Sequence, residues 1–499
     1  MQRILILSFC VLAVAAGGCK KFLDKQLLGQ TTPDNFFTSD ANAQLALNAA
    51  YAPLSFTSGA SNAVWVLGDV ASDDAIKGGQ PGDQADFDAI DQFNILTTNS
   101  AVEAVWQRYY DGVFKCNVVL DGLPASNTKV SDAVKKSVIA QAKFLRAYYY
   151  FILTSCYGDI PLHLKVETPE ELQSPALSQD SIFRQVEADC LAAAPDLPDA
   201  THGADLGRAS KWAALALLSK AYLFHTALPN HWQLAAQAAQ QVVDSKQYSL
   251  TARYWDNFSA ATKDNTEAIL TVNHITGYQP IQGNELNAWF SPRSLTGYGF
   301  FYPTQDLVDN FEAGDPRLDY TVGRAGHPYF DTPFDPSWTT TGYITKKMVQ
   351  PLSEVPIGKK NDGSVNYEAI RYSDVLLVLA EAYNESGNAA AALAPLDSVR
   401  RRARESYLYD PSLPGYGTVP AGLLPDVTTT DQAQLRDAIR RERRSELAME
   451  FHRFFDVIRY GSAYATSALS KGAPNFNYDK NKWFPIPQSE RDTNKKLGK

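Results

Sequence analysis

Aromatic and hydrogen-bonding side chains are mixed within one irregular stretch of the chain, residues 275–345. The apolar C–H face of a sugar ring packs on a flat aromatic ring, and its hydroxyl groups bond to amide, carboxylate and guanidinium groups. The stretch therefore favours carbohydrate binding, although each ring could instead pack inside the loop. The candidates for ligand contact here are Trp289, Trp338, Tyr298, Tyr302, Asn287 and Arg293, with the two tryptophans first because they offer the largest stacking face.

A second irregular stretch, residues 60–95, is crowded with aspartates. Two carboxylates about 5 to 10 Å apart can form the acid/base pair of a glycoside hydrolase. Oxygen-rich loops also suit calcium, and Asp favours turns because it bonds its own backbone. The remaining interpretation is hydrogen bonding to a ligand, for which Asp73 and Asp74 are the candidates.

The sequence carries none of the common catalytic signatures. It lacks a His-Glu-x-x-His zinc motif, a Gly-x-Ser-x-Gly elbow, a phosphate-binding glycine loop and a Cys-x-x-Cys pair. We therefore expect a protein that is not an enzyme, with no catalytic residue, no metal-ligating residue and no cofactor; a structural calcium ion is the one alternative left open. The formal charge is −9 and the basic residues form no stripe, which argues against nucleic acid as a partner.

Cys19 ends an N-terminal segment that has the features of an export signal. Arg3 gives it a positive start, Ile4 to Ala16 form an apolar core, and Gly17-Gly18 precede the cysteine. The apolar core is shorter than the roughly 20 residues that span a bilayer. We expect residues 1–18 to be a lipoprotein signal peptide and Cys19 to carry the lipid. The other cysteines, Cys116, Cys156 and Cys190, are expected to be buried thiols or to include one incidental bridge.

Four stretches have the three- and four-residue apolar spacing of helices. They are residues 134–156, a hairpin over 209–243, a hairpin over 372–404 that turns at 384–388, and one long helix over 435–460. A short strand is predicted at 268–272. The arginines and glutamates of residues 436–446 are expected to form an ion-paired network between helices.

The two hairpins resemble tetratricopeptide repeats, whose period is about 34 residues. Small residues such as Ala380 and Ala392 stand where two helices of a repeat must approach closely. The expected fold class is mostly α, with repeat-like helical hairpins as a scaffold and an irregular, loop-rich cap. The scaffold would comprise about residues 35–60, 100–260 and 365–465, and the cap about residues 60–95 and 275–345.

Six blocks in order along the chain resemble the SusD/RagB family, the surface lipoproteins of nutrient uptake in Bacteroidetes. They are Cys19 with Phe22-Leu23-Asp24, Arg146 to Phe151 ending in Tyr157-Gly158-Asp159-Ile160-Pro161-Leu162, Arg208-Ala209-Ser210-Lys211, Arg371 to Leu377 with Ala380-Glu381-Ala382, Arg441 to Leu447, and Phe484-Pro485-Ile486-Pro487. The chain departs from the family at Phe451, where a glycine is usual, which implies a locally different helix contact.

The resemblance implies one SusD-like unit over residues 19–499, anchored by lipid in the outer membrane and facing the cell surface. It implies a non-catalytic protein that captures an oligosaccharide and delivers it to a SusC-like TonB-dependent transporter. A peptide cargo, as in the RagB branch, is the first alternative. A lipid-anchored glycoside hydrolase and a repeat scaffold for protein partners are the others.

Overall fold

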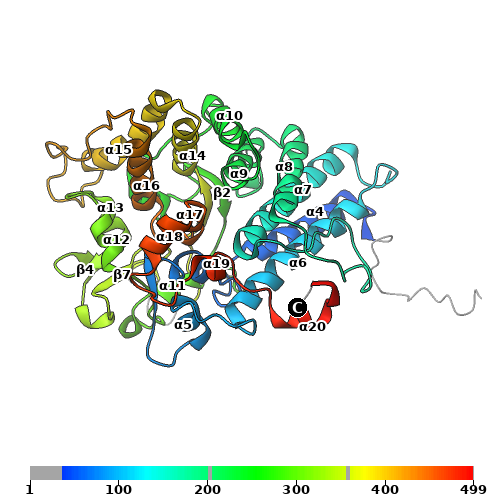
Figure 1. The fold of residues 1–499 in the computed structure, drawn as a ribbon, viewed down its shortest axis with the longest axis horizontal. Helices are drawn as coiled ribbons and strands as arrows, with labels where there is room; N and C mark the ends of the chain where they lie inside the picture. Colours follow the sequence, from blue (N-terminus) through cyan, green and yellow to red (C-terminus); the bar gives the residue numbers. More distant parts are fainter. Residues whose placement is uncertain (1–35, 201–204, 356–359, 498–499) are drawn as a thin grey trace, which may run out of the picture.

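The structure is a computed structural model, and it describes residues 36–200, 205–355 and 360–497. Cys19 and the segment that precedes it lie outside the described residues. Helices dominate the fold, as Figure 1 shows, and the strands are short and paired in twos. Among the described residues, no helix is both long enough and apolar enough to span a membrane.

The α-helices are α4 (Asp40–Tyr51), α5 (Ala85–Asp91), α6 (Ser100–Gly122), α7 (Asp132–Tyr157), α8 (Gln179–Ala193), α9 (Lys211–Phe224), α10 (His231–Asp244), α11 (Leu286–Phe290), α12 (Gln305–Asn310), α13 (Arg317–Thr321), α14 (Tyr372–Glu385), α15 (Ala389–Tyr409), α16 (Gln432–Leu447), α17 (Arg453–Arg459), α18 (Ser462–Leu469), α19 (Tyr478–Asn481) and α20 (Gln488–Thr493). The strands are β1 (Ala75–Gly78), β2 (Ala268–Val272), β3 (Phe300–Pro303), β4 (Val322–Arg324), β5 (Pro328–Tyr329), β6 (Thr332–Pro333), β7 (Tyr343–Thr345) and β8 (Tyr367–Arg371).

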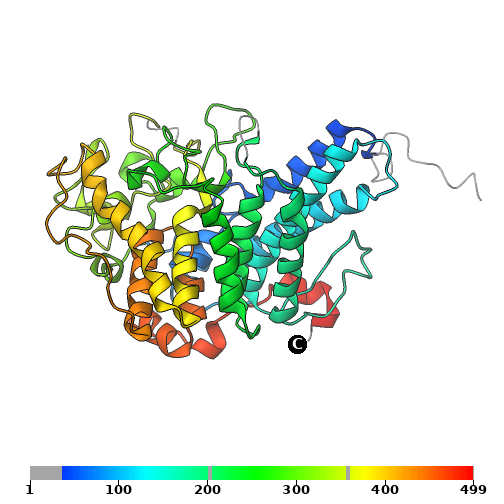
Figure 2. The same ribbon diagram turned by 90° about the horizontal axis from the view of Figure 1, so that it is seen from above.

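The scaffold is a row of antiparallel helices, from α6 and α7 through α8, α9 and α10 to α14, α15 and α16 (Figure 2). The predicted helices 134–156, 209–243 and 372–404 are confirmed as α7, the pair α9 and α10, and the pair α14 and α15. Ala380 and Ala392 are fully buried in the cluster where α14 meets α15. Small side chains let the helix axes approach, and the expected repeat-like hairpins are confirmed.

The predicted long helix over 435–460 is wrong, because α16 ends at Leu447 and α17 begins at Arg453. Between them Met449 and Phe451 have positive φ angles of 62° and 72°, which a helix cannot contain. The carboxylate of Asp69 accepts the N–H groups of Phe451 at 2.8 Å and Arg453 at 3.0 Å. The backbone that a glycine adopts easily is thus held in place here by a buried aspartate, while the ring of Phe451 stacks on Tyr367.

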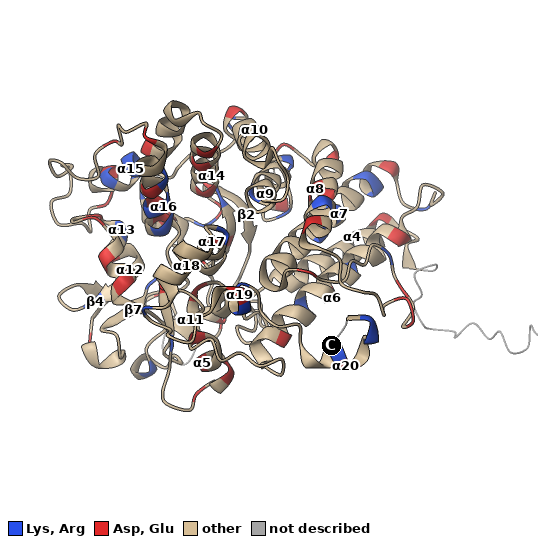
Figure 3. Cartoon of the chain, viewed as in Figure 1, with Lys and Arg blue, Asp and Glu red and all other residues tan. Residues whose placement is uncertain are grey.

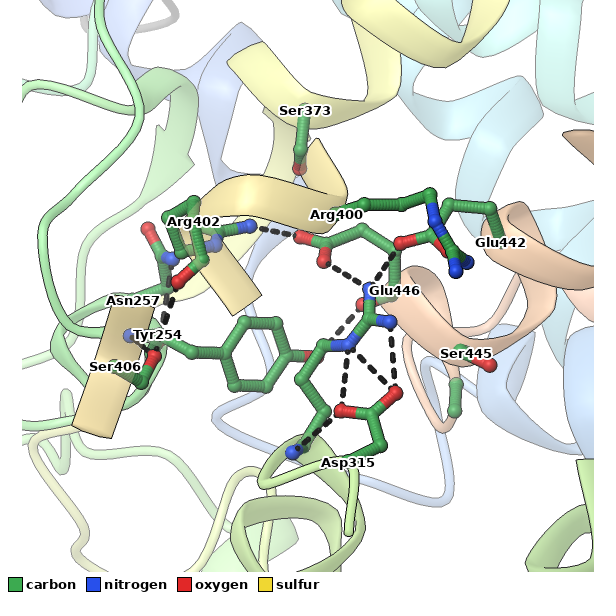
Figure 4. A network of polar contacts seen from close by, with 12 residues as sticks. Tyr254, Asn257, Asp315, Ser373, Arg400, Arg402, Ser406, Glu442, Ser445 and Glu446 are labelled. Atoms are coloured by element: carbon green, nitrogen blue, oxygen red, sulfur yellow. Dashed lines mark hydrogen bonds and ion pairs between the residues drawn. The ribbon is translucent and has the colours of Figure 1, made fainter. Parts of the chain in front are cut away.

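The predicted ion-paired network exists, and it extends well beyond α16. Figure 4 shows Glu446 of α16 facing Arg402 of α15. Glu446 also pairs with Arg371 at 2.7 Å and with Arg317 at 3.1 Å, and all of these side chains are at least 96% buried. Burial alone would raise the pKa of Glu446, but the surrounding guanidinium groups hold its pKa well below the ordinary value. Throughout the fold, Lys and Arg are interspersed with Asp and Glu (Figure 3).

Two short antiparallel pairs attach the irregular segments to the scaffold. Strand β1 pairs with β3, with Ala75 opposite Pro303 and Gly78 opposite Phe300, so residues 60–95 and 275–345 meet. Strand β2, the predicted strand, pairs with β8, which leads directly into α14. The three cysteines of the described part, Cys116, Cys156 and Cys190, are free and buried, which confirms the first of the two expectations for them.

His274 follows β2 and fastens it to the N-terminal part of the chain. Its Nε2 atom accepts the N–H of Phe56 at 3.0 Å, and the backbone N–H of His274 donates to Oδ1 of Asn366 at 3.0 Å. Only a neutral imidazole can accept this bond. Burial lowers the pKa of His274 to about 3.

We expect the substitution Glu446→Gln to lower the free energy of unfolding by about 3–5 kcal/mol, because three buried guanidinium groups lose their shared counter-charge. Denaturant unfolding of the variant and the unmodified protein measures this difference. Asp437→Asn, an exposed acid on the same helix, is the matched control and should change stability by less than about 0.5 kcal/mol. Equal losses in the two variants would contradict a structural role for the network.

We expect His274 to make stability fall as the pH drops below its unfolded pKa of 6.5. The folded pKa is depressed, so the unfolded state binds the proton first, and the contribution of His274 is lost progressively down to about pH 3. The slope should be about 1.4 kcal/mol per pH unit. His274→Gln keeps an acceptor for Phe56 and removes the proton site, so its unfolding free energy should fall less steeply between pH 6.5 and 4. If the curves of unfolding free energy against pH run parallel for the two proteins between pH 6.5 and 4, this assignment is contradicted. Above about pH 7.5 the two curves should run parallel, because His274 is then neutral in both states.

Candidate functional site

The candidate site is the surface where β1 and β3 bring the two irregular segments together. Arg293 follows the end of α11 and forms an ion pair with Asp83, which lies 210 positions earlier in the chain. Asp83 also accepts the N–H of Gln80 at 2.8 Å, which fixes its loop. The Arg293 and Asp83 side chains remain 42% and 34% exposed, so a ligand can reach both a donor and an acceptor here.

Tyr298 supplies the exposed aromatic ring of this surface. Its residue is 39% exposed, and its N–H donates to the carbonyl of Ala288 at 2.7 Å. The ring stands at 89° to that of Trp289, with 5.4 Å between centroids. This edge contact supports one side of the Tyr298 ring and leaves another part open to solvent.

Trp289, the first candidate from the sequence, lies beneath this surface. It is 6% exposed and packs between Phe87 and Phe300, with centroids 5.8 and 5.0 Å away. Its indole N–H donates to Glu285 at 3.1 Å. With its ring enclosed and its only donor satisfied, Trp289 supports Tyr298 from below and has almost no surface for a ligand.

Tyr302 and Trp338 are joined to each other at the edge of the same region. The hydroxyl of Tyr302, which is 3% exposed, donates to the carbonyl of Trp338 at 2.9 Å. Trp338 is half-buried, and its ring packs edge-on against Tyr329 and Phe334. Trp338 thus keeps part of a stacking surface, whereas Tyr302 acts as its support.

Asn287 is fully buried, and both ends of its amide are bonded within the protein. Its Oδ1 accepts the N–H of Gln350 and its Nδ2 donates to the carbonyl of Lys360, each at 2.8 Å. No part of this side chain faces solvent. Its place is in the wall that carries α11, so the structure does not bring Asn287 to the exposed group of Arg293 and Tyr298.

Asp73 and Asp74 are likewise bonded inside the protein. Asp73 pairs with Arg453 through both oxygens, at 2.7 and 2.8 Å, and Asp74 pairs with Arg444 at 2.7 Å. Their side chains are 6% and 1% exposed. These aspartates therefore connect the loop to α16 and α17, and an acid/base pair acting on a substrate would first have to break buried ion pairs.

The other aspartates of this loop are also committed to local structure. Asp69 binds the turn at Phe451, Asp86 accepts the N–H of Ser100, and Asp91 accepts the N–H of Lys77. The described part of the chain contains no group of three or more His, Cys, Asp or Glu side chains placed to hold a metal ion. The abundance of Asp in residues 60–95 is accounted for by turns and ion pairs.

Asp83 was missed as a ligand candidate, although it lies in the aspartate-rich loop. Asp83 becomes a candidate because it pairs with Arg293. No local sequence pattern predicts a contact between residues so far apart in the chain. Arg293 lies against Gly299, the residue after Tyr298, and both the Arg293 and the Tyr298 side chains are exposed. The structure keeps Trp338 partly open and buries Trp289, Tyr302, Asn287, Asp73 and Asp74.

Two family models match the chain. One, described as the SusD family, covers residues 266–499, and the other, described as "Starch-binding associating with outer membrane", covers residues 21–223. Together they include the region of the candidate site and the scaffold helices other than α10.

Individual proteins resemble the chain over nearly its full length. SusD-like protein P2 of Formosa agariphila is 26% identical, covering 98% of both chains. A solved structure titled a laminarin-binding SusD-like protein is 29% identical with a TM-score of 0.77, covering 93% of this chain and 99% of that one. A SusD-like carbohydrate-binding protein from Bacteroides fragilis is 25% identical with a TM-score of 0.79, covering 93% and 100%. With the same fold and both family models matched, this chain belongs to the SusD/RagB family.

Proposed function

We propose that this protein is a non-catalytic glycan-binding lipoprotein of the cell surface. In this proposal it captures an oligosaccharide at the outer membrane and delivers it to a SusC-like TonB-dependent transporter. The observation that carries the proposal is the exposed group of Tyr298, Arg293 and Asp83 over a buried aromatic base.

The chemistry of this group suits a sugar better than a hydrophobic ligand. A pyranose ring can lay its C–H face on Tyr298 while its hydroxyls accept from Arg293 and donate to Asp83. The base of Trp65, Phe87, Trp289 and Phe300 is packed ring against ring, so binding does not have to order it. Binding would then require little rearrangement of the protein.

Relatives guide the choice of sugar. The 29% identical neighbour is named for laminarin, a β-glucan, and one matched family description names starch. We therefore propose a glucan as the cargo class, with laminarin as the first probe and starch as the second. A ligand contact at Trp338, beside Tyr302, would extend the site along a chain of several sugars.

The first prediction concerns glycan binding by a soluble form that begins at Lys20. We expect laminarin cast into a native gel to retard it, and Tyr298→Ala and Arg293→Ala each to weaken binding about tenfold or more. Arg293→Ala removes a charged hydrogen bond worth about 1.5–3 kcal/mol, and Tyr298→Ala removes the ring on which the sugar stacks. Tyr416→Ala removes a tyrosine that is 54% exposed and lies outside both cap segments, and it should bind normally.

Two results would count against this proposal. Equal retardation of all three variants would place the glycan elsewhere on the molecule. If the folded protein binds neither laminarin, starch nor the other glucans tested, the proposal that it captures glucans is rejected.

The second prediction concerns anchoring by Cys19. We expect Cys19→Ala to move the protein from the membrane fraction to the soluble fraction of its host, because no lipid can then be attached. Cys10→Ala, a cysteine inside the expected signal peptide, is the matched control and should stay in the membrane fraction. Mass spectrometry of the mature N-terminus measures the lipid directly, and an unmodified Cys19 in the membrane fraction would contradict the proposal.

A further inference from the structure

A groove lies on the opposite part of the molecule from the candidate site, between α6, the arm of residues 160–177 and α20. Figures 1 and 2 show the arm and α20 beside the α6 end of the row of helices. The groove has a volume of about 780 Å³. Its lining includes Trp106, Tyr110, Phe114, His163, Leu172 and Asn494.

The groove is held open by hydrogen bonds to the backbone of the arm. The hydroxyl of Tyr110 donates to the carbonyl of Pro161 at 2.7 Å, and Asn117 donates to the carbonyls of His163 and Lys165. On the other side, Asn494 donates to Ser174 at 2.9 Å. The arm therefore stands away from α6 as a preformed wall.

Apolar side chains form much of the exposed surface of the groove, and the charged groups of Asp111, Lys165 and Glu167 already have partners. Phe114 and Leu172 are 52% and 46% exposed there, and the rings of Trp106 and Tyr110 lie 4.7 Å apart. His163 is bonded to Glu167. An occupant rich in hydroxyl groups would find few free partners, whereas apolar side chains would cover exposed Phe and Leu.

The described chain begins beside this groove. The ring of Phe37 lies against Gly122 at the end of α6, and Phe37 lines a smaller hollow together with Val166 of the arm. Asp121 accepts the N–H of Val166 at 2.7 Å, which ties the arm to the same end of α6. The start of the described chain therefore lies next to the groove.

The sequence before Phe36 matches the groove in reach and in chemistry. Phe22-Leu23 and Leu27-Leu28 are two apolar pairs, with Lys20, Lys21 and Lys25 around them. The seven residues 29–35 can span up to about 25 Å when extended. Glu490 lines the groove and offers the opposite charge.

We propose that the groove is the docking site for the segment Phe22–Leu28 of the same chain. The effect of docking on the position of the protein at the membrane rests on the proposed lipid at Cys19. With the segment docked, only Lys20 and Lys21 separate the lipid from the body, so the groove end of the molecule is held at the membrane. With it undocked, residues 20–35 would let the body move up to about 55 Å away.

A disulfide trap in the full-length, membrane-anchored protein tests the docking. We expect Leu27→Cys with Leu172→Cys to form an intramolecular disulfide on mild oxidation, identified by mass spectrometry of the linked peptides. Leu27→Cys with Leu191→Cys is the matched control, because Leu191 is 53% exposed on α8 and outside the groove. The groove pair should give about tenfold more product, since docking raises the local concentration of the two thiols.

A second variant separates docking from chance collision. Phe114→Asp places a charge in the groove at an exposed position, so the protein should still fold, and it should raise hydrogen exchange of the amides of residues 22–28. Equal trapping at Leu172→Cys and Leu191→Cys, or unchanged exchange in Phe114→Asp, would overturn the proposal. Disulfides between two copies would instead assign the groove to a second molecule and would also overturn it.

The outcome is independent of the proposed function. The same trap in a Cys19→Ala protein should still close, because docking needs neither the lipid nor a glycan. If no disulfide forms but laminarin still retards the protein, only the docking proposal is rejected. If the disulfide forms but no glycan binds, only the proposed glycan cargo is rejected.

Discussion

The buried pairing of Glu446 with Arg317, Arg371 and Arg402 is the contact on which the rest of the structure depends. It joins the last scaffold helix to α15, to the junction of β8 with α14, and to the short helix α13 that belongs to the cap. Charges buried to this degree are costly unless each is fully partnered. Their arrangement therefore favours one relative placement of scaffold and cap, since any other would separate the buried carboxylate of Glu446 from guanidinium groups that now surround it.

The end of the same helix and the start of the next control the cap through a second set of ions. Arg444 and Arg453 hold Asp73 and Asp74, while Asp69 binds the backbone at Phe451 and so ends the helix between them. The loop of residues 69–74 leads directly into β1, and β1 pairs with β3. The position of the surface around Tyr298 and Arg293 is thus set by ion pairs between residues that lie far from it in sequence. The segments around this surface themselves have little regular structure.

Periodicity was sufficient to predict α7 and the two hairpins, because a helix face needs only local spacing, but it did not indicate the scaffold helices α6 and α8. The break between α16 and α17 was not predictable in that way: the apolar spacing of residues 435–460 continues through it, and the left-handed Phe451 depends on Asp69 from a distant loop. The family's usual glycine at this position was the signal that could have indicated a helix end.

In the candidate site too, some features were predictable from the sequence and others depended on contacts between distant segments. Residue type selected Arg293 and Tyr298, which the structure leaves exposed, but it ranked Trp289 first because of its large ring. A large ring also gains most from burial, so size alone cannot distinguish a stacking surface from a core. Burial here is decided by Phe87 and by Phe300, whose strand pairs with β1, and these contacts between distant segments leave no local pattern.

One exposed ring and one ion pair offer a sugar only a few contacts, and this favours a polymeric cargo. A single sugar bound by such a group would dissociate quickly, but a polysaccharide presents the same unit repeatedly, so that release of one unit is followed by capture of the next. Weak contact also suits the proposed delivery, because a protein that passed its cargo to a transporter would gain nothing from holding it tightly. The exposed ion pair, which a ligand can engage without entering a closed cavity, is consistent with such exchange.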